Sequence, residues 1–249
     1  MSAAALSLKE YAKLLKLPTF ADIKEVIEEF KSDGDLEGFT LKLLKREYDA
    51  RRFNNQQRRI KCAHFPQVKT LEEFDLSRLR NVRPDFVLEL ASCEFVKRHE
   101  NVIMVGTPGT GKTHLMTALG VKACYCGMSV LFKNAGQLAT EMREARDNYR
   151  LQTMIKSIAR IDLLLLDELS YAKFGQEESE MLFRIISDRA ERASTIITTN
   201  VGFSHWKEMF ANDILTAAFV DRITFRSHIL DMNGDSYRLV SSLNKRAAL

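Results

Sequence analysis

From residue 101 onward, short apolar runs alternate with amphipathic segments that are long enough to form helices. Five runs predict strands: NVIMVG (101–106), SVLFK (129–133), IDLLLLDE (161–168), STIITTN (194–200) and HILDM (228–232). Largely apolar runs of this kind are typical of strands that a parallel sheet buries on both faces. The pattern therefore predicts an α/β domain over residues 101–249, in which helices flank a parallel sheet.

The first 62 residues follow a helical pattern instead. The spacing of apolar positions predicts three helices, over residues 7–15, 19–30 and 36–61. Ser7 and Glu10 form a capping-box pattern for the first helix, and Thr19 begins the second. We therefore expect a small all-α domain over residues 1–62.

Residues 63–100 connect these two regions. Four apolar side chains favour an ordered strap, packed on a neighbouring domain, over a flexible linker: Phe65, Val68, Leu71 and Phe74. A helix is expected over residues 85–97, because Pro84 suits the first turn of a helix.

Composition narrows the class of protein. Apolar residues make up 45% of the chain and charged residues 28%, which is typical of a globular protein. The four cysteines lack the paired spacing of a metal site, and no secretory signal is recognisable, so we expect reduced thiols in a cytoplasmic protein. No run approaches the roughly 20 apolar residues of a membrane span.

Positive charge is concentrated in the third predicted helix. Residues 42–61 carry eight basic and two acidic side chains, a local balance of +6 in a chain whose net charge is +4. Repeats of seven residues align much of this charge into a broad stripe on a helix. The candidate DNA contacts in the stripe are Lys45, Arg51, Arg52, Arg58, Arg59 and Lys61. Such a stripe can neutralise backbone phosphates, although a merely solvated helix face is the alternative.

A glycine-rich loop follows the first predicted strand and opens a helix. It matches GxxxxGK[ST] through Gly106, Thr107, Pro108, Gly109, Thr110, Gly111, Lys112 and Thr113. Its backbone N–H groups can point at the phosphates of a nucleoside triphosphate. Lys112 would reach the β and γ phosphates, and the Thr113 hydroxyl would bind Mg²⁺.

Two later strands end in polar side chains that complete this site. The run of four leucines delivers Asp167 and Glu168 to the carboxyl edge of the sheet, where doubly wound folds bind ligands. Asp167 is the expected Mg²⁺ partner, and Glu168 is placed to orient or deprotonate the attacking water. Asn200 ends the next strand, where its amide can hold that water.

Two arginines near the C-terminus are further candidates. Phosphoryl transfer gains from a cation that meets the charge developing on the γ phosphate, and a neighbouring subunit can supply it. Arg222 and Arg238 could each serve in this way. From spacing alone, either could equally form a surface ion pair.

Taken in order, GTPGTGKTH, LLLLDE, ITTN, VDRI and DSYR resemble the motifs of AAA+ ATPases of the DnaC/IstB group. The resemblance covers about residues 74–238. The basic helix, the phenylalanine–proline strap and KTLEEFD are more similar to the IstB branch, the helper ATPases encoded beside transposases in bacterial insertion sequences.

The resemblance implies ATP and Mg²⁺ as ligands and distinguishes the two arginines. Asp167 and Glu168 would be the Walker B pair, and Asn200 a nucleotide sensor. Arg222 would be the finger that reaches the next subunit's ATP, and Arg238 the second sensor. Family members form ATP-dependent oligomers on DNA, and the IstB type is understood to bend double-stranded target DNA and to recruit or stimulate its transposase, in the bacterial cytoplasm.

One departure from the broader AAA+ pattern concerns the C-terminus. Only eleven residues follow Arg238, so we expect a reduced lid with at most one short helix. Secondary candidates for DNA contact are Tyr171, Lys173, Arg143, Arg146 and Arg150.

Two alternatives stay open at this point. A replicative helicase loader of the DnaC type would share the ATPase domain but would use its N-terminal helices to grip a helicase. A non-catalytic DNA-bending protein would hold ATP only between its subunits. Glu168 argues against the second alternative, and the +6 segment argues against the first.

Overall fold

The computed structural model describes residues 3–22, 27–28, 36–210 and 212–237. The chain divides into two compact units, Met1–Arg58 and Arg59–Leu249. Each unit is described below by itself.

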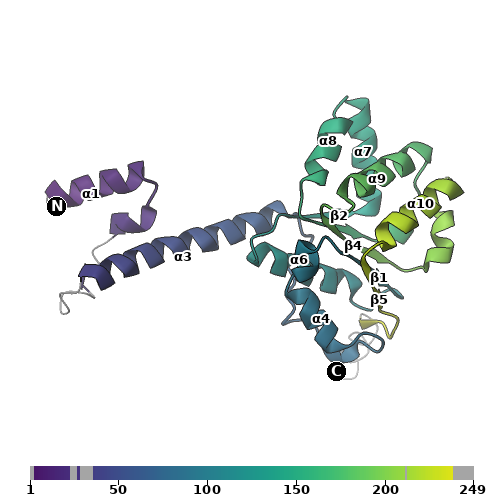
Figure 1. The fold of residues 1–249 in the computed structure, drawn as a ribbon, viewed down its shortest axis with the longest axis horizontal. Coiled ribbons are helices and arrows are strands. Elements are labelled where there is room, and N and C mark those ends of the chain that lie inside the picture. The colour runs from purple at the N-terminus through teal and green to yellow at the C-terminus, as the bar shows by residue number, and fades with distance from the viewer. Residues whose placement is uncertain (1–2, 23–26, 29–35, 211, 238–249) are drawn as a thin grey trace, which may run out of the picture. The chain divides into compact units, whose positions relative to one another are not determined.

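The second unit is built on a five-stranded, all-parallel sheet with the strand order β2-β3-β4-β1-β5 (Figure 1). Its strands are β1 (Asn101–Val105), β2 (Val130–Asn134), β3 (Leu163–Asp167), β4 (Ser194–Thr199) and β5 (Ser227–Asp231). All five predicted strands are confirmed, as is the parallel arrangement.

Helices cover both faces of the sheet (Figure 1). They are α4 (Pro84–Ala91), α5 (Glu94–Lys97), α6 (Lys112–Tyr125), α7 (Ala135–Asp147), α8 (Leu151–Ala159), α9 (Gln176–Arg189) and α10 (Asp213–Thr224). On β3, Leu163 and Leu165 join the core that contains α6, whereas Leu164 and Leu166 join the core beneath α7 to α10. Burial on both faces explains why this strand is apolar throughout.

The strand order places β4 between β3 and β1. Met104 of β1 pairs with Thr198 of β4, and Leu166 of β3 pairs with Ile197. The loops that follow β1, β3 and β4 therefore meet at one edge of the sheet, and β4 is central to them.

The connector lies against the sheet, as expected of a strap. Leu71 and Val82 are buried in the same core as α6, and Phe65 and Phe74 pack against that core. Val68 is an exception, since 52% of its surface is exposed.

The helix predicted over residues 85–97 is interrupted, so that prediction was wrong in its length. Pro84 does occupy the first turn of α4, but α4 ends at Ala91. Cys93 has a φ of +62°, which an α-helix cannot accommodate, so the chain breaks there and the short helix α5 begins at Glu94.

The first unit contains α1 (Ala3–Leu14), the 3₁₀ helix η1 (Pro18–Asp22) and most of α3 (Leu36–Cys62). Helix α1 begins before Ser7, so the prediction that Ser7 caps it was wrong. The helix predicted over residues 19–30 is a 3₁₀ helix at its start, and most of its remainder lies outside the described residues. Helix α3 begins where the sequence predicted, with Gly38 in its first turn.

A buried carboxylate, Glu47 of α3, joins the described parts of this unit. It accepts hydrogen bonds from Thr19 Oγ1 at 2.6 Å and from Arg51 Nε at 2.6 Å. Burial would raise the pKa of Glu47, but the hydrogen bonds from Thr19 and Arg51 outweigh it and lower the pKa. The Glu47 carboxylate therefore stays ionised and connects α3 to η1 through Thr19.

Among the helices of the described residues, none combines the length and the apolar character that crossing a membrane requires.

Candidate active site

The loop between β1 and α6 depends on its glycines. Gly109 and Gly111 have φ angles of +85° and +94°, a region that favours glycine. Gly106 has a different reason: a Cβ at this position would lie 2.4 Å from the backbone carbonyl of Met232. The loop can therefore curl tightly and bring the backbone N–H groups at the start of α6 to its concave side.

Lys112 is buried at the start of α6, and its side chain turns back onto the loop. Its ammonium group donates to the Gly106 carbonyl at 2.6 Å and to the Thr107 carbonyl at 2.8 Å. The cation is thus held beside the loop backbone. A polyphosphate in the loop would offer this ammonium charged acceptors, which bind it more strongly than neutral carbonyls.

Asp167 lies buried at the end of β3. Its Oδ1 atom accepts hydrogen bonds from Thr113 Oγ1 at 3.1 Å and from Thr198 Oγ1 at 2.5 Å. Burial raises the pKa of the Asp167 carboxyl above its ordinary value, although the two hydroxyls act in the opposite direction. The structure thus brings together Thr113 and Asp167, the two predicted Mg²⁺ ligands. A hydroxyl beside a buried carboxylate is a donor set that suits Mg²⁺.

Glu168 is exposed at the same edge, and its backbone is held in an unusual conformation. Its φ angle is +58°, and its N–H group donates to Thr198 Oγ1 at 2.9 Å. The carboxylate of Glu168 accepts a hydrogen bond from Asn134 Nδ2 at 2.9 Å. Its direction is therefore set by a residue of β2.

Asn134 was missed by the sequence interpretation. It pairs with Asp167 in the register of β2 and β3, which explains how its side chain reaches the next residue. Its Oδ1 atom also caps α7, accepting from the N–H groups of Gly136 at 3.0 Å and Gln137 at 3.4 Å. An asparagine between a strand and a helix is a recognisable capping signal, but only the register reveals its second contact.

Lys112, Thr113, Glu168 and Thr198 line one cavity of about 240 Å³, together with the predicted Asn200. Asp167 and Asn134 do not line it themselves but are hydrogen-bonded to residues that do. The Asn200 N–H donates to Ser170 Oγ at 3.1 Å. Tyr171, a secondary candidate for DNA contact, also lines this cavity.

The connector strap supplies a further wall of the cavity. The residues that it contributes are Lys69, Glu73, Phe74, Asp75, Arg78 and Leu79. A Cβ on Gly111 would come within 2.9 Å of the Phe74 ring, which also meets His114 edge to face at 5.2 Å between centroids. The apolar spacing of the strap predicted that Phe74 is packed, but not that it borders this site.

The segment after β5 lies against the glycine-rich loop. Thr107 N–H donates to Asn233 Oδ1 at 3.1 Å, and Tyr237 N–H donates to the Gly109 carbonyl at 2.8 Å. The Arg78 guanidinium lies 4.2 Å from the centroid of the Tyr237 ring, which borders the cavity. The predicted Arg238 is the next residue and lies outside the described residues.

Arg222 is exposed on α10 and does not line the cavity of its own chain. The described residues therefore do not bring it together with Lys112, Asp167 and Glu168.

The six basic candidates of α3 differ in their surroundings. Arg51 binds Glu47 and also donates to the Lys16 carbonyl, so it serves the structure of the first unit. Arg59 is half-buried. The remaining four are exposed and form no ion pair within the described part of the chain: Lys45, Arg52, Arg58 and Lys61.

Sequence comparison with known proteins identifies one family. The family model described as IstB-like ATP binding protein matches residues 11–245. The putative ATP-binding protein of insertion sequence IS21 from Pseudomonas aeruginosa is 39% identical over 209 residues, which cover 84% of this chain and 79% of the relative. The putative ATP-binding protein of insertion sequence IS5376 from Geobacillus stearothermophilus is 31% identical over 232 residues, 92% of each chain.

Solved structures share the fold at lower identity. AMPPCP-bound DnaA from Aquifex aeolicus has a TM-score of 0.58 and 21% identity, over 75% of this chain and 57% of that chain. DnaI has a TM-score of 0.55 and 19% identity, over 68% of this chain and 89% of that chain. The predicted P-loop AAA+ architecture is thereby confirmed.

Proposed function

The chain belongs to the family of IstB-like ATP-binding proteins, and from this premise we propose that it hydrolyses ATP to control its own assembly on double-stranded DNA. The assembly would bend or otherwise remodel target DNA and recruit or stimulate a partner transposase. Relatives named for insertion sequences support a role in transposition. Under this proposal residues 1–62 bind DNA, residues 63–100 form the connector and residues 101–249 are the ATPase domain.

The observation that carries the catalytic part is the shared position of Thr113, Asp167 and Glu168 at one sheet edge. Mg²⁺, held by Thr113 and Asp167, would neutralise charge on the β and γ phosphates. Lys112 would bind the same phosphates once it leaves the carbonyls of its own loop. Glu168 would orient the attacking water and accept its proton, with Asn200 holding that water from the other side.

The proposed active unit is a homo-oligomer. Arg222 is exposed and does not line the cavity of its own chain, so a neighbouring copy could present it to the γ phosphate. In the sequence Arg238 comes directly after Tyr237, which lines the cavity, and we propose that Arg238 acts within its own chain.

ATP hydrolysis with and without duplex DNA tests the proposal, using wild type and Glu168→Gln. We expect Glu168→Gln to bind ATP and Mg²⁺ normally while hydrolysis falls by about 10²-fold or more, as for loss of a general base. Equal, negligible hydrolysis by both proteins would leave only the non-catalytic DNA-bending alternative.

A binding assay separates the helicase-loader alternative. Stable, stoichiometric binding of this protein to a replicative helicase would refute the transposition role. Binding to the transposase encoded beside it, dependent on ATP and target DNA, would support that role.

A further inference from the structure

The turn between α7 and α8 presents a tyrosine to solvent. Tyr149 is 99% exposed, and its backbone has a φ of +57°. The turn is closed by two backbone hydrogen bonds, from Tyr149 N–H to the Arg146 carbonyl at 2.9 Å and from Arg150 N–H to the Ala145 carbonyl at 2.7 Å. This is the hydrogen-bond pattern of a Schellman motif, in which glycine usually occupies the position of Tyr149.

A bulky residue at this position needs an explanation. The left-handed conformation is unfavourable for a residue with a Cβ. The Tyr149 ring recovers none of this by packing, because it is almost fully exposed. A ring on a closed, defined turn is, however, well placed to contact another molecule.

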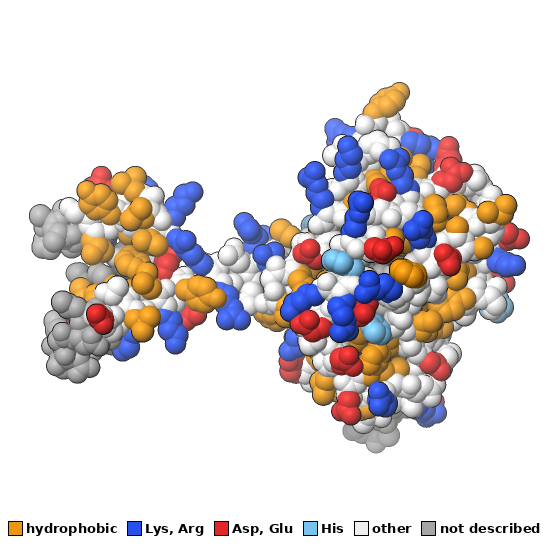
Figure 2. All heavy atoms as spheres, in the orientation of Figure 1, with side chains coloured by type: hydrophobic (Ala, Val, Ile, Leu, Met, Phe, Trp, Pro, Cys, Tyr) orange, Lys and Arg blue, Asp and Glu red, His pale blue; other side chains and the backbone are white. Residues whose placement is uncertain are grey.

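Basic side chains accompany the ring. Arg143, Arg146 and Arg150 follow one another at spacings of three and four residues, along α7 and into the turn. Lys156 and Arg160 are exposed on and after α8. Figure 2 shows basic side chains gathered over α7 and α8 around a projecting hydrophobic side chain.

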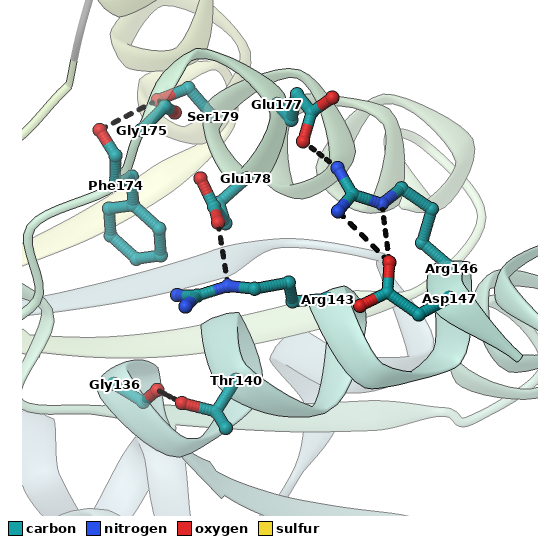
Figure 3. Close-up of polar contacts among 10 residues, drawn as sticks. All are labelled: Gly136, Thr140, Arg143, Arg146, Asp147, Phe174, Gly175, Glu177, Glu178 and Ser179. Atoms are coloured by element: carbon teal, nitrogen blue, oxygen red, sulfur yellow. Dashed lines mark hydrogen bonds and ion pairs between the residues drawn. The ribbon is translucent and has the colours of Figure 1, made fainter.

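Two of these arginines are paired with acids of α9 (Figure 3). Arg143 Nε lies 3.0 Å from Glu178 Oε1, and Arg146 pairs with Glu177 and with Asp147. The side chains of Arg143 and Arg146 are still 56% and 37% exposed. The pair of Arg146 with Glu177 is exposed on both sides and contributes little stability, so a phosphate can compete for the Arg146 guanidinium group. The Glu178 partner of Arg143 is only 13% exposed, so a phosphate would reach Arg143 from its exposed side, in addition to this pair. Arg150 forms no ion pair within the part of the chain that the structure describes.

We propose that the α7–α8 turn is a second contact with duplex DNA, at which Tyr149 inserts against a base step while Arg143, Arg146 and Arg150 bind the flanking phosphates. This inference rests on the proposed function, since it requires a protein that acts on duplex DNA. Side chains inserted between base pairs partly unstack them and kink the duplex. Aromatic rings flanked by guanidinium groups match bases flanked by phosphates. If the Tyr149 ring instead bound in a groove of a partner protein, we would expect a cluster of apolar side chains around it.

The experiment measures binding and bending separately. Full-length protein with a non-hydrolysable ATP analogue is added to a duplex carrying a fluorophore at each end. Binding is followed by anisotropy over a range of salt concentrations, and bending by energy transfer between the ends. The variants are Tyr149→Ala, Tyr149→Phe, Tyr149→Gly and Arg150→Gln, with Tyr125→Ala as a control at a partly exposed tyrosine of α6.

We expect Tyr149→Ala and Tyr149→Gly to lower the bending signal at least about twofold, while Tyr149→Phe and Tyr125→Ala keep it. Tyr149→Gly should also raise Tm, because it removes the left-handed strain, so reduced bending cannot come from unfolding. Arg150→Gln should reduce the salt slope of binding by about one.

The inference would be overturned if the Tyr149→Ala variant bent the duplex as much as wild type and if Arg150→Gln left the salt slope of binding unchanged. Failure of the wild type to bind duplex DNA at all would instead refute the proposed function. The two failures are therefore distinguishable.

Discussion

Thr198 offers the sharpest test of the site, because one hydroxyl contacts both acidic residues. It donates to Asp167 Oδ1 at 2.5 Å and accepts from the Glu168 N–H at 2.9 Å. Thr198 is buried. Thr198→Val keeps the shape of the side chain and removes both hydrogen bonds.

The magnitude follows from those two contacts. A hydrogen bond to a charged group is worth about 1.5–3 kcal/mol, and an orphaned N–H group costs about 1–3 kcal/mol. The Glu168 backbone is only partly buried, which lowers the second contribution. We therefore expect Thr198→Val to lower the free energy of unfolding by about 2–4 kcal/mol at neutral pH.

The pH dependence has a definite sign. Burial raises the pKa of Asp167, and the Thr198 hydroxyl lowers it, so Thr198→Val raises this pKa further. A carboxyl whose folded pKa exceeds its unfolded value weakens the fold above the unfolded pKa, where ionisation is resisted by burial. The penalty of Thr198→Val should therefore be largest at pH 7–8 and should shrink as pH falls and Asp167 becomes protonated.

Urea unfolding at pH 8 and pH 5 measures this, with Thr198→Ser as the matched control that keeps the hydroxyl. The acid limb of Mg²⁺-dependent ATP hydrolysis should also move to higher pH in Thr198→Val. A pH-independent penalty, or a Thr198→Ser variant as unstable as Thr198→Val, would show that packing and not the hydroxyl matters.

The remaining predictions concern other parts of the site. Asn134→Ala should raise basal ATP hydrolysis, because Glu168 loses the amide that holds it. The same change should lower the free energy of unfolding by about 0.5–2 kcal/mol, because α7 loses its cap. Asn134→Asp keeps the cap acceptor, so an equal loss of stability in both variants would contradict this account. Arg222→Ala should leave ATP binding intact and abolish hydrolysis, and mixing it with Lys112→Ala should restore part of the activity; no recovery in the mixture would count against action between subunits. Arg52→Ala with Arg59→Ala should flatten the salt dependence of DNA binding by about one to two units of slope. Arg51→Ala should instead reduce stability, because Arg51 binds Glu47, and chemical denaturation distinguishes the two effects.

Much of the fold follows from local pattern. The five apolar runs predicted the strands, because burial on both faces demands continuous apolar sequence. The glycine-rich loop and the pair Asp167–Glu168 were likewise recognisable, since loop and strand end are each defined by adjacent residues. The start of α1 and the break at Cys93 could not be recognised from the sequence. Each depends on how the chain packs against residues that are distant in the sequence, and not on the spacing of neighbouring apolar positions.

The residues that complete the site could not be predicted from the sequence. Thr198 reaches Asp167 because β4 lies between β1 and β3, and Asn134 reaches Glu168 because of the register of β2 with β3. Phe74 and Tyr237 border the cavity from segments that precede and follow the sheet.

The sequence by itself determined which elements form and which loop can hold a triphosphate, because these properties depend on residues close together in the chain. Only the tertiary structure decided which hydroxyl and which amide orient the two acidic residues. The physical reason is that hydrogen bonds act over about 3 Å, and strand order and register, set by packing of the whole sheet, decide which distant residues come within that distance.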